Sequence, residues 1–426
     1  MRNNPAAYAL TCVFGAFALS VASPSVPFAG AAQAAAPAPT EGLREWLAKP
    51  RDGRPELKDQ AFAKASLTKE QAEQARQLLW DDHLADLRAT REKEWKDESI
   101  TIGEHTLRFK HRQFGEKPKD GWSLYISMHG GGNAPAEVND QQWQNQIRLY
   151  TPKEGLYIAP RAPTNTWNLW HEGHMDDLFD RLLEDAFAVG DVNPNRIYLM
   201  GYSAGGDGVY QLAPRMADRW AAASMMAGHP NDASPLGLRN IGFAIHVGAL
   251  DDGYNRNKVA GEWKKKLDDL RAADPKGYEH VAELHAGRGH WMEREDAVAV
   301  EWMAGFTRNP IPEKVVWKQA GRTHDRFYWL GVPPKEAKGG SLVIVSRDGQ
   351  KIEIEKVEGV AHLVVMLNDA MVDLDKPVTV TMKGKELFSG VVPRTIGGLQ
   401  STLAGRGDPF LTFPAAVTVD LDERAH

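Results

Sequence analysis

Residues 196–208 read RIYLMGYSAGGDG, an apolar run that ends abruptly at two glycines on either side of Ser203. The run RIYLM has the length and composition of a buried strand, and the residues after Ser203 have the pattern of a helix start. A serine between Gly201 and Gly205 lies in a sharp turn from strand to helix, with its hydroxyl exposed near the helix N-terminus. The stretch therefore predicts either a tight turn alone or a turn that presents a nucleophile.

Short β-like runs alternate with amphipathic helical patterns on both sides of this stretch. Such alternation indicates an α/β fold, in which helices cover both faces of a mostly parallel sheet. A hairpin pattern at 98–114 precedes the alternation. The expected strands are SLYISMHG (123–130), GLYIAP (155–160), RIYLMGYS (196–203), AAASMMAG (221–228), GFAIHVGAL (242–250) and EHVAELHAG (279–287), and the clearest helical patterns cover 175–190 and 258–275.

The rest of the chain has a different sequence pattern from this central part, residues 99–308. Residues 37–98 read as a charged helical arm, in which Thr68 and Gln71 can form a capping box. Residues 309–426 are rich in strand patterns and hairpin turn signals, with no strong helix between them. This pattern is typical of a small all-β, sandwich-like domain.

The first 36 residues predict a secretory signal peptide. They have a positive start, an apolar middle and an alanine-rich exit, and the apolar segment is short for a membrane span. We therefore expect a periplasmic or secreted protein with no integral membrane span after cleavage, although an uncleaved anchor is an alternative. The single cysteine, Cys12, lies in this segment, so the mature chain would rely on its core rather than on disulfides.

Composition limits the classes of partner. The chain has 426 residues, 42% hydrophobic and 25% charged, which is ordinary for a soluble globular protein with more than one domain. Its formal net charge is −6, and no block of lysine and arginine stands out. These features argue against nucleic acid or an anionic membrane surface as the partner.

A serine hydroxyl becomes a strong nucleophile only when a nearby base takes its proton. In this type of sheet the acid and the histidine follow the serine along the chain, each on a loop after a later strand. The strand GFAIHVGAL ends at Asp251 and Asp252, and EHVAELHAG is followed by His290. We expect Ser203 as nucleophile, His290 as base and Asp251 as the acid that orients it, with Asp252 as the rival acid. The alternative for His290 is a histidine in a surface loop.

The glycine-rich loop HGGG, residues 129–132, follows an early strand and is expected to form an oxyanion hole. Backbone N–H groups directed at a developing negative charge contribute roughly 3–4 kcal/mol of transition-state stabilisation per donor. The expected donors are Gly131, with Gly132 as an alternative, and Ala204, the residue after the nucleophile. A phosphate-binding loop is excluded because the segment lacks the Lys-Ser/Thr pair of a P-loop and does not fit G-x-G-x-x-G.

Together, HGGG, GYSAGG, GALDD and GRGHW resemble the motifs of the α/β-hydrolase fold. Within that fold they are similar to secreted esterases of the polyhydroxybutyrate depolymerase and feruloyl esterase kind, and to bacterial predicted peptidases. The resemblance covers about residues 100–308. It implies a serine hydrolase that acts through an acyl-enzyme and needs no cofactor. Many secreted relatives carry disulfides, and the absence of cysteine outside the predicted signal peptide departs from that pattern.

Other residues near the same end of the sheet are candidates for a substrate pocket. Trp167 and Trp170 could form an aromatic wall for an acyl or aryl group, or could instead be core residues of a covering loop. The pair His171 and His174 with Glu172 has the wrong spacing for H-E-x-x-H and no evident third ligand, so no metal is expected. The expected pocket residues are His129, Tyr202, Trp167, Trp170, His171, His229 and Trp291.

These features predict an exported serine hydrolase that cleaves carboxylic esters, either small molecules or polymers such as a polyester or an acylated polysaccharide. A serine peptidase of the same fold is one alternative. A polymer-binding protein with an inactive hydrolase domain is another, in which the strand-rich domain would bind the polymer. Acyl and alcohol specificity depend on pocket shape, which the sequence does not give.

Overall fold

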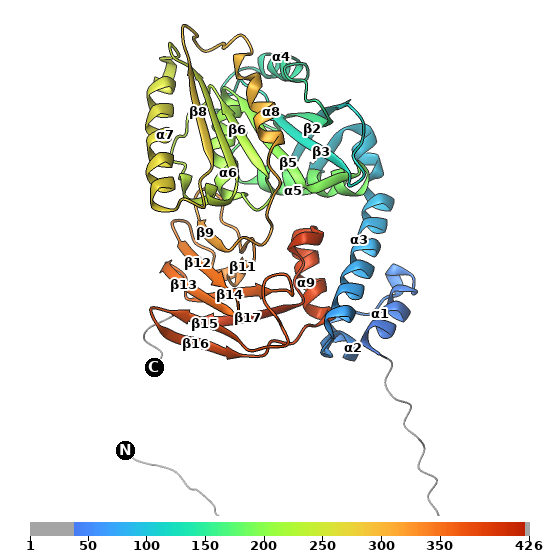
Figure 1. Cartoon of the computed structure of the whole chain (residues 1–426). Coiled ribbons are helices and arrows are strands. Elements are labelled where there is room, and N and C mark those ends of the chain that lie inside the picture. The colour runs from blue at the N-terminus through green and yellow to red at the C-terminus, as the bar shows by residue number, and fades with distance from the viewer. Residues whose placement is uncertain (1–37, 422–426) are drawn as a thin grey trace, which may run out of the picture. The chain divides into compact units, whose positions relative to one another are not determined.

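An eight-stranded sheet forms the central part of the computed structural model, which describes residues 38–421 (Figure 1). Its strands are β1 (Ser99–Ile102), β2 (His105–Phe114), β3 (Trp122–Met128), β4 (Gly155–Arg161), β5 (Val192–Tyr202), β6 (Ala222–Met226), β7 (Gly242–Gly248) and β8 (His280–His285). They lie in the order β1-β2-β4-β3-β5-β6-β7-β8. Neighbours from β4 to β8 are parallel, whereas β1 with β2 and β2 with β4 are antiparallel. The predicted α/β architecture, a mostly parallel sheet preceded by a hairpin, is confirmed.

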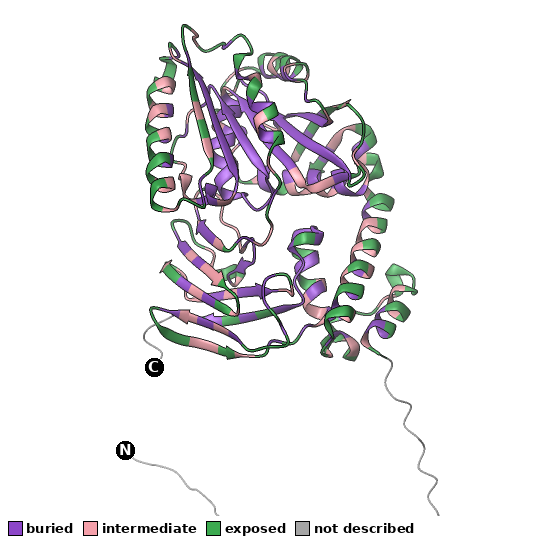
Figure 2. Ribbon diagram, viewed as in Figure 1, coloured by how far each residue is buried: buried purple, intermediate pink, exposed green. Residues whose placement is uncertain are grey.

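Helices cover both faces of this sheet. They are α4 (Ala136–Gln146), α5 (His174–Ala188), α6 (Ala204–Arg215), α7 (Arg256–Ala273) and α8 (Val298–Ala304). Side chains of α5, α6 and α7 share one hydrophobic cluster with the sheet, and side chains of α4 and α8 belong to a second cluster. Strands β3, β4 and β7 are buried along their whole length, as Figure 2 shows for the centre of the sheet. A strand buried on both faces needs the continuous apolar runs that the sequence has there.

The helical arm consists of α1 (Pro39–Leu47), α2 (Ala61–Lys64) and the long helix α3 (Lys69–Asp97). The predicted capping box is present: Thr68 Oγ1 accepts from the N–H of Gln71 at 3.2 Å, and Gln71 Oε1 accepts from the N–H of Thr68 at 2.9 Å. Farther along α3, Glu94 forms an ion pair of 2.7 Å with Arg181 of α5. The C-terminal half of α3 thus packs on the central part of the chain.

The strand-rich part after residue 309 contains two sheets, which agrees with the sandwich-like prediction. One sheet has the order β16-β15-β13-β12-β9 and the other β10-β11-β14-β17. These strands are β9 (Lys314–Lys318), β10 (Arg326–Phe327), β11 (Leu330–Gly331), β12 (Leu342–Asp348), β13 (Lys351–Glu358), β14 (His362–Leu367), β15 (Val378–Met382), β16 (Lys385–Gly390) and β17 (Ala415–Asp420).

The expectation that no strong helix interrupts these strands is wrong, because α9 (Ile396–Arg406) lies between β16 and β17. Glycines in its first turn weaken its intrinsic propensity and hide it in the sequence. Thr395 caps its start, accepting from the N–H of Gly398 at 3.0 Å, and Gly407 ends it with φ +57°. Its buried leucines belong to one cluster with α1 and α3, so tertiary packing stabilises it.

Residues from Ala38 onward belong to one compact unit, so the divisions at 98/99 and 308/309 stay predictions of the sequence. The predicted signal peptide, 1–36, lies outside the described residues, and its cleavage and the export of the protein stay predictions too. Between residues 38 and 421, no helix has both the length and the apolar character to cross a bilayer.

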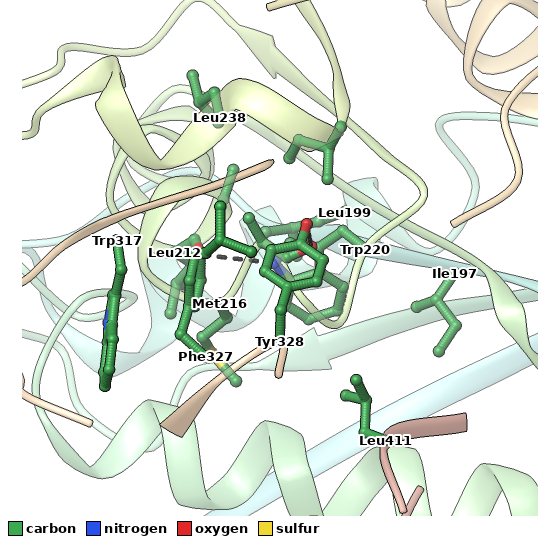
Figure 3. Packing of buried hydrophobic residues seen from close by; sticks show 14 of the residues in the cluster. Ile197, Leu199, Leu212, Met216, Trp220, Leu238, Trp317, Phe327, Tyr328 and Leu411 are labelled. Atoms are coloured by element: carbon green, nitrogen blue, oxygen red, sulfur yellow. Dashed lines mark hydrogen bonds between the residues drawn. The ribbon is translucent and has the colours of Figure 1, made fainter. Parts of the chain in front are cut away.

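The strand-rich part is joined to the central sheet by apolar packing. Figure 3 shows Phe327 and Tyr328 beside Leu212, Met216 and Trp220, which come from α6 and the turn after it. The Tyr328 hydroxyl donates to the carbonyl of Ala217 at 2.9 Å. One hydrophobic cluster therefore continues from the central sheet into the two smaller sheets.

Buried charges lie in the same junction. The carboxylate of Asp408 is fully buried and accepts from Arg308 at 2.7 Å, and the side chain of Arg308 is only 1% exposed. Arg308 also donates to the carbonyl of Asp218 at 2.7 Å, and the Asp218 carboxylate forms an ion pair with Arg406. Burial alone raises the pKa of Asp408, but the guanidinium groups of Arg308 and Arg219 outweigh it and hold that pKa below its ordinary value.

We predict that Asp408→Ala lowers the free energy of unfolding by about 3–5 kcal/mol, because it leaves Arg308 as a buried charge without its partner. Urea denaturation measures this change. The control is Asp177→Ala, which removes the same side chain from an exposed pair with Arg322 and is expected to cost at most about 1 kcal/mol. Equal losses in the two variants would contradict the prediction.

Candidate active site

Ser203 lies in a strained turn between β5 and α6. Its backbone has φ 57° and ψ −120°, a conformation that residues other than glycine rarely adopt. Its N–H donates to the carbonyl of Met226 at 2.9 Å. A Cβ on Gly201 would lie 2.2 Å from the carbonyl oxygen of Gly205, and a Cβ on Gly205 would lie 2.2 Å from that of Met128. Both glycines are therefore required by close backbone contact, and the turn holds Ser203 at the C-terminal end of the sheet.

The structure brings the three predicted triad residues together. His290 Nε2 lies 2.9 Å from Ser203 Oγ, and His290 Nδ1 lies 2.8 Å from Asp251 Oδ2. Asp251 is 3% exposed, whereas Asp252 is an exposed residue, and it is Asp251 that faces His290. Of the two candidate acids, Asp251 is therefore the one whose carboxylate lies beside His290. A carboxylate on one imidazole nitrogen and a hydroxyl on the other is the arrangement that lets histidine act as a base.

Backbone contacts join the loop that carries the acid to the loop that carries the histidine. The N–H of Leu250 donates to the carbonyl of Arg288 at 2.8 Å. Tyr202, predicted as a pocket residue, instead lies under the histidine loop: its hydroxyl donates to the carbonyl of His290 at 2.6 Å and accepts from the N–H of Met292 at 3.0 Å. Tyr202 therefore helps to place His290 above the serine.

The predicted oxyanion donors have different environments. Ala204 is the first residue of α6, where an α-helix leaves its N–H groups without intrahelical partners. Gly131 has φ +107°, and its loop passes next to the serine, since a Cβ on Gly130 would lie 3.1 Å from Ser203 Cβ. The prediction of Gly132 as an alternative oxyanion donor is wrong, because its N–H already donates to Asn139 Oδ1 at 2.8 Å.

Asn139 is a residue that the sequence analysis missed. It is fully buried in α4, and its Nδ2 donates to the carbonyl of Ala134 at 3.0 Å while its Oδ1 holds Gly132. The side chain therefore ties the C-terminal end of the glycine-rich loop to the helix. Its place seven residues after Gly132, in the segment NDQQWQN, shows no pattern that distinguishes it from its polar neighbours.

A cavity of about 560 Å³ opens at Ser203 and Ala204. Of the predicted pocket residues it includes Trp167, which is 59% exposed, and His229. Its further lining is mostly polar. The lining residues are Gly131, Gly132, Asn133, Trp167, Ser203, Ala204, Asp207, His229, Asn231, Tyr254, Asn255 and Arg256.

Two predicted pocket residues are core residues instead. Trp170 is completely buried, and its Nε1 donates to the carbonyl of His129 at 2.8 Å; of the two alternatives for Trp170, the aromatic wall is wrong and the core residue is confirmed. His129 is also buried, and its Nε2 accepts from the N–H of Ala162 at 3.2 Å. Burial lowers the pKa of His129 to about 3, which keeps the ring neutral. The two side chains thus pack on the buried side of the glycine-rich loop and help to hold it in place.

His171 and Trp291 lie near the site but do not line the cavity. His171 packs edge-on against Trp167 with ring centroids 5.3 Å apart, and burial lowers its pKa to about 4. Trp291 is 51% exposed and packs against Tyr202. Neither His171 nor His174 belongs to a group of three metal-ligand side chains among the residues that the structure describes.

Asp207 is a second residue at the site that the sequence did not predict, although it lies in RIYLMGYSAGGDG, one helical turn after Ser203. It lines the cavity, and its Oδ1 accepts from the N–H of His229 at 2.6 Å. Burial raises its pKa from the ordinary 3.8 to about 6, against the opposing effects of that N–H and of Arg256. The guanidinium of Arg256 lies over the ring of Tyr254, 4.8 Å from its centroid.

We predict that Asp207→Asn stabilises the protein at neutral pH. The folded-state pKa is raised, so Asp207 takes up a proton on folding between about pH 4 and 6, and its ionisation destabilises the fold as the pH rises through that window. The variant should be as stable as the original below pH 4 and more stable above pH 6, by up to about 3 kcal/mol. Urea denaturation from pH 4 to 8 measures this, and parallel stability curves for the two proteins would contradict it.

No protein-family model and no curated protein matches the sequence. Solved structures are similar to about half of the chain. A thermostable esterase has a TM-score of 0.37 at 16% identity, over 49% of this chain and 62% of the esterase, less than two thirds of its length. A poly(3-hydroxybutyrate) depolymerase from Bordetella parapertussis has a TM-score of 0.36 at 14% identity, over 48% of this chain and 86% of that one. A feruloyl esterase module from Clostridium thermocellum has a TM-score of 0.36 at 14% identity, over 49% of this chain and 86% of that module.

Proposed function

We propose that this protein is a serine hydrolase that cleaves carboxylic esters through an acyl-enzyme, with Ser203 as nucleophile, His290 as general base and acid, and Asp251 as the orienting acid. The observation that carries the proposal is the continuous chain of contacts from Asp251 through His290 to the strained Ser203, with distances of 2.8 and 2.9 Å. A histidine that served only to stabilise a loop would not need a serine held at positive φ beside it.

In the first half of the reaction Ser203 Oγ attacks the ester carbonyl, and His290 Nε2 takes the hydroxyl proton. The buried carboxylate of Asp251 accepts from Nδ1–H and stabilises the imidazolium that forms. The negative charge on the carbonyl oxygen is stabilised by the N–H groups of Gly131 and Ala204. Collapse of this intermediate breaks the bond to the alcohol, which leaves with the proton from His290.

The second half releases the acyl group. A water molecule attacks the acyl-enzyme carbonyl while His290 Nε2 takes its proton, and the same two N–H groups stabilise the oxyanion. The proton then returns to Ser203 Oγ as the acid product leaves. All proton transfers occur at one nitrogen, which agrees with a His290 side chain that is 44% exposed and accessible to water and to the alcohol.

The polar lining of the cavity favours binding of a polar acyl or alcohol group over a long aliphatic chain. Three asparagines, Asp207, Arg256, His229 and Ser203 make up seven of its twelve lining residues, and the two large aromatic residues, Trp167 and Tyr254, are 59% and 79% exposed. Burial of a long alkyl chain would need an apolar wall, because only apolar area removed from water stabilises such a ligand.

We predict that Ser203→Ala abolishes turnover of short p-nitrophenyl esters and abolishes labelling by a fluorophosphonate probe, since no oxygen remains to form the acyl or phosphonyl bond. Turnover is followed by release of nitrophenolate, and labelling by intact mass. Peptide anilides tested beside the esters show whether amides are also cleaved. A Ser203→Ala protein that keeps its turnover would overturn the proposal.

Asp251→Asn and Asp252→Asn form a matched pair, because the same change is made at neighbouring positions. The first removes the charge that orients and stabilises His290, and kcat should fall by roughly 10³–10⁴-fold. The second alters an exposed side chain and should leave kcat close to its original value. Equal effects of the two substitutions would show that the acid has been assigned incorrectly.

A further inference from the structure

Two buried histidines lie side by side on the strands that precede the acid and the histidine of the candidate triad. His246 is in β7 and 2% exposed, and His285 ends β8 and is 4% exposed. His246 Nδ1 lies 3.1 Å from His285 Nε2, and the two rings are nearly parallel, with centroids 5.3 Å apart. The proposed ester hydrolysis uses neither residue.

A carboxylate completes the cluster. Glu283 is the partner of His246 in the parallel pairing of β7 and β8, and its side chain is 58% exposed. One ligand atom from each of His246, Glu283 and His285 lies within 4.8 Å of the other two. Because Glu283 is exposed and the histidines lie behind it, the cluster is accessible from solvent on its carboxylate side.

From these contacts we infer that His246, His285 and Glu283 form a binding site for a divalent transition-metal ion, with Zn²⁺ as the ion that the donor set fits best. Imidazole nitrogen with one carboxylate oxygen is a ligand set of zinc, and it leaves a fourth position for water. The site lies outside the cavity at Ser203, and the inference does not depend on the proposed ester hydrolysis.

The two facing ring nitrogens lie near the separation that a shared metal ion needs, whereas Glu283, whose Oε1 lies 3.8 Å from His285 Nδ1, has to turn its exposed side chain to reach that ion. With bonds of about 2.1 Å, nitrogens 3.1 Å apart subtend an angle of about 95° at the ion, and an opening of about 0.3 Å makes the angle tetrahedral. His285 also has the outer partner that metal-bound histidines have: its Nδ1 lies 3.4 Å from Glu295 Oε2. Glu295 in turn is held by Arg288, which donates to it at 2.9 Å.

The position of the site indicates what the ion would do. His246 lies five residues before Asp251, and His285 lies five residues before His290. An ion bound by both histidines joins β7 to β8, the edge strand, just below the two loops that carry the acid and the base. It would therefore stabilise the edge of the sheet and hold these loops together, rather than take part in the reaction at Ser203.

The test uses the full chain, freed of metal by chelation and then titrated with ZnCl₂, with CoCl₂ as a spectroscopic probe. We expect one Zn²⁺ per chain by calorimetry, a rise in Tm with Zn²⁺ but not with Mg²⁺, and visible absorption from bound Co²⁺. Glu283→Gln changes an exposed ligand with little risk to folding and should weaken Zn²⁺ binding at least about tenfold. His246→Gln should abolish it.

Two controls separate this site from other histidines and from the proposed reaction. His280→Gln changes a histidine on the same strand that contacts Asp268 instead, and it should bind Zn²⁺ as the original protein does. Ser203→Ala should also bind Zn²⁺ fully, so a failure of the proposed hydrolysis leaves this inference standing. Absence of one-to-one binding, or binding that is unchanged in Glu283→Gln and His246→Gln, would overturn it.

Discussion

The close contact between the end of β5 and the start of α6 is the constraint on which the candidate site depends. Gly201 and Gly205 bring two backbone segments so near that no side chain fits between them, and Ser203 takes a positive φ as a result. The strain is maintained because β5 lies in the middle of a buried parallel sheet and α6 is packed on it. A turn at the edge of the molecule could relax, and this one cannot.

Everything else at the site is placed relative to that turn by loops at the same end of the sheet. The glycine-rich loop follows β3, the acid follows β7 and the histidine follows β8, so parallel strands deliver all of them to one edge. Short backbone contacts then hold the acid and histidine loops together, and Tyr202, the residue before Ser203, donates its hydroxyl to the histidine loop. The rigid sheet thus carries the site, and the loops carry its chemistry.

Much of this arrangement could be predicted because it depends on local signals. The apolar runs identified the strands, the glycine pattern identified the turn, and chain order with loop position pointed to His290 and to the pair Asp251 and Asp252. The predictions that failed depended on burial and on hydrogen-bond partners that no local sequence pattern marks. Trp170 looked like a pocket residue because its loop was placed correctly, but the direction of its ring was decided by His129 and the core behind it. Gly132 was excluded as a donor only because Asn139 accepts its N–H.

The sequence by itself determined the order of strands and helices in residues 99–308, the turn at Ser203 and the identity of the nucleophile and base candidates, because these follow from periodicity and from residues that act within a few positions. Only the tertiary structure placed Asp251, and not Asp252, beside His290, made α9 a helix, and brought Asp207 to the cavity and His246 beside His285. Each of these depends on which distant groups share a buried space, where a hydrogen bond or a charge is satisfied by one neighbour and excluded by another.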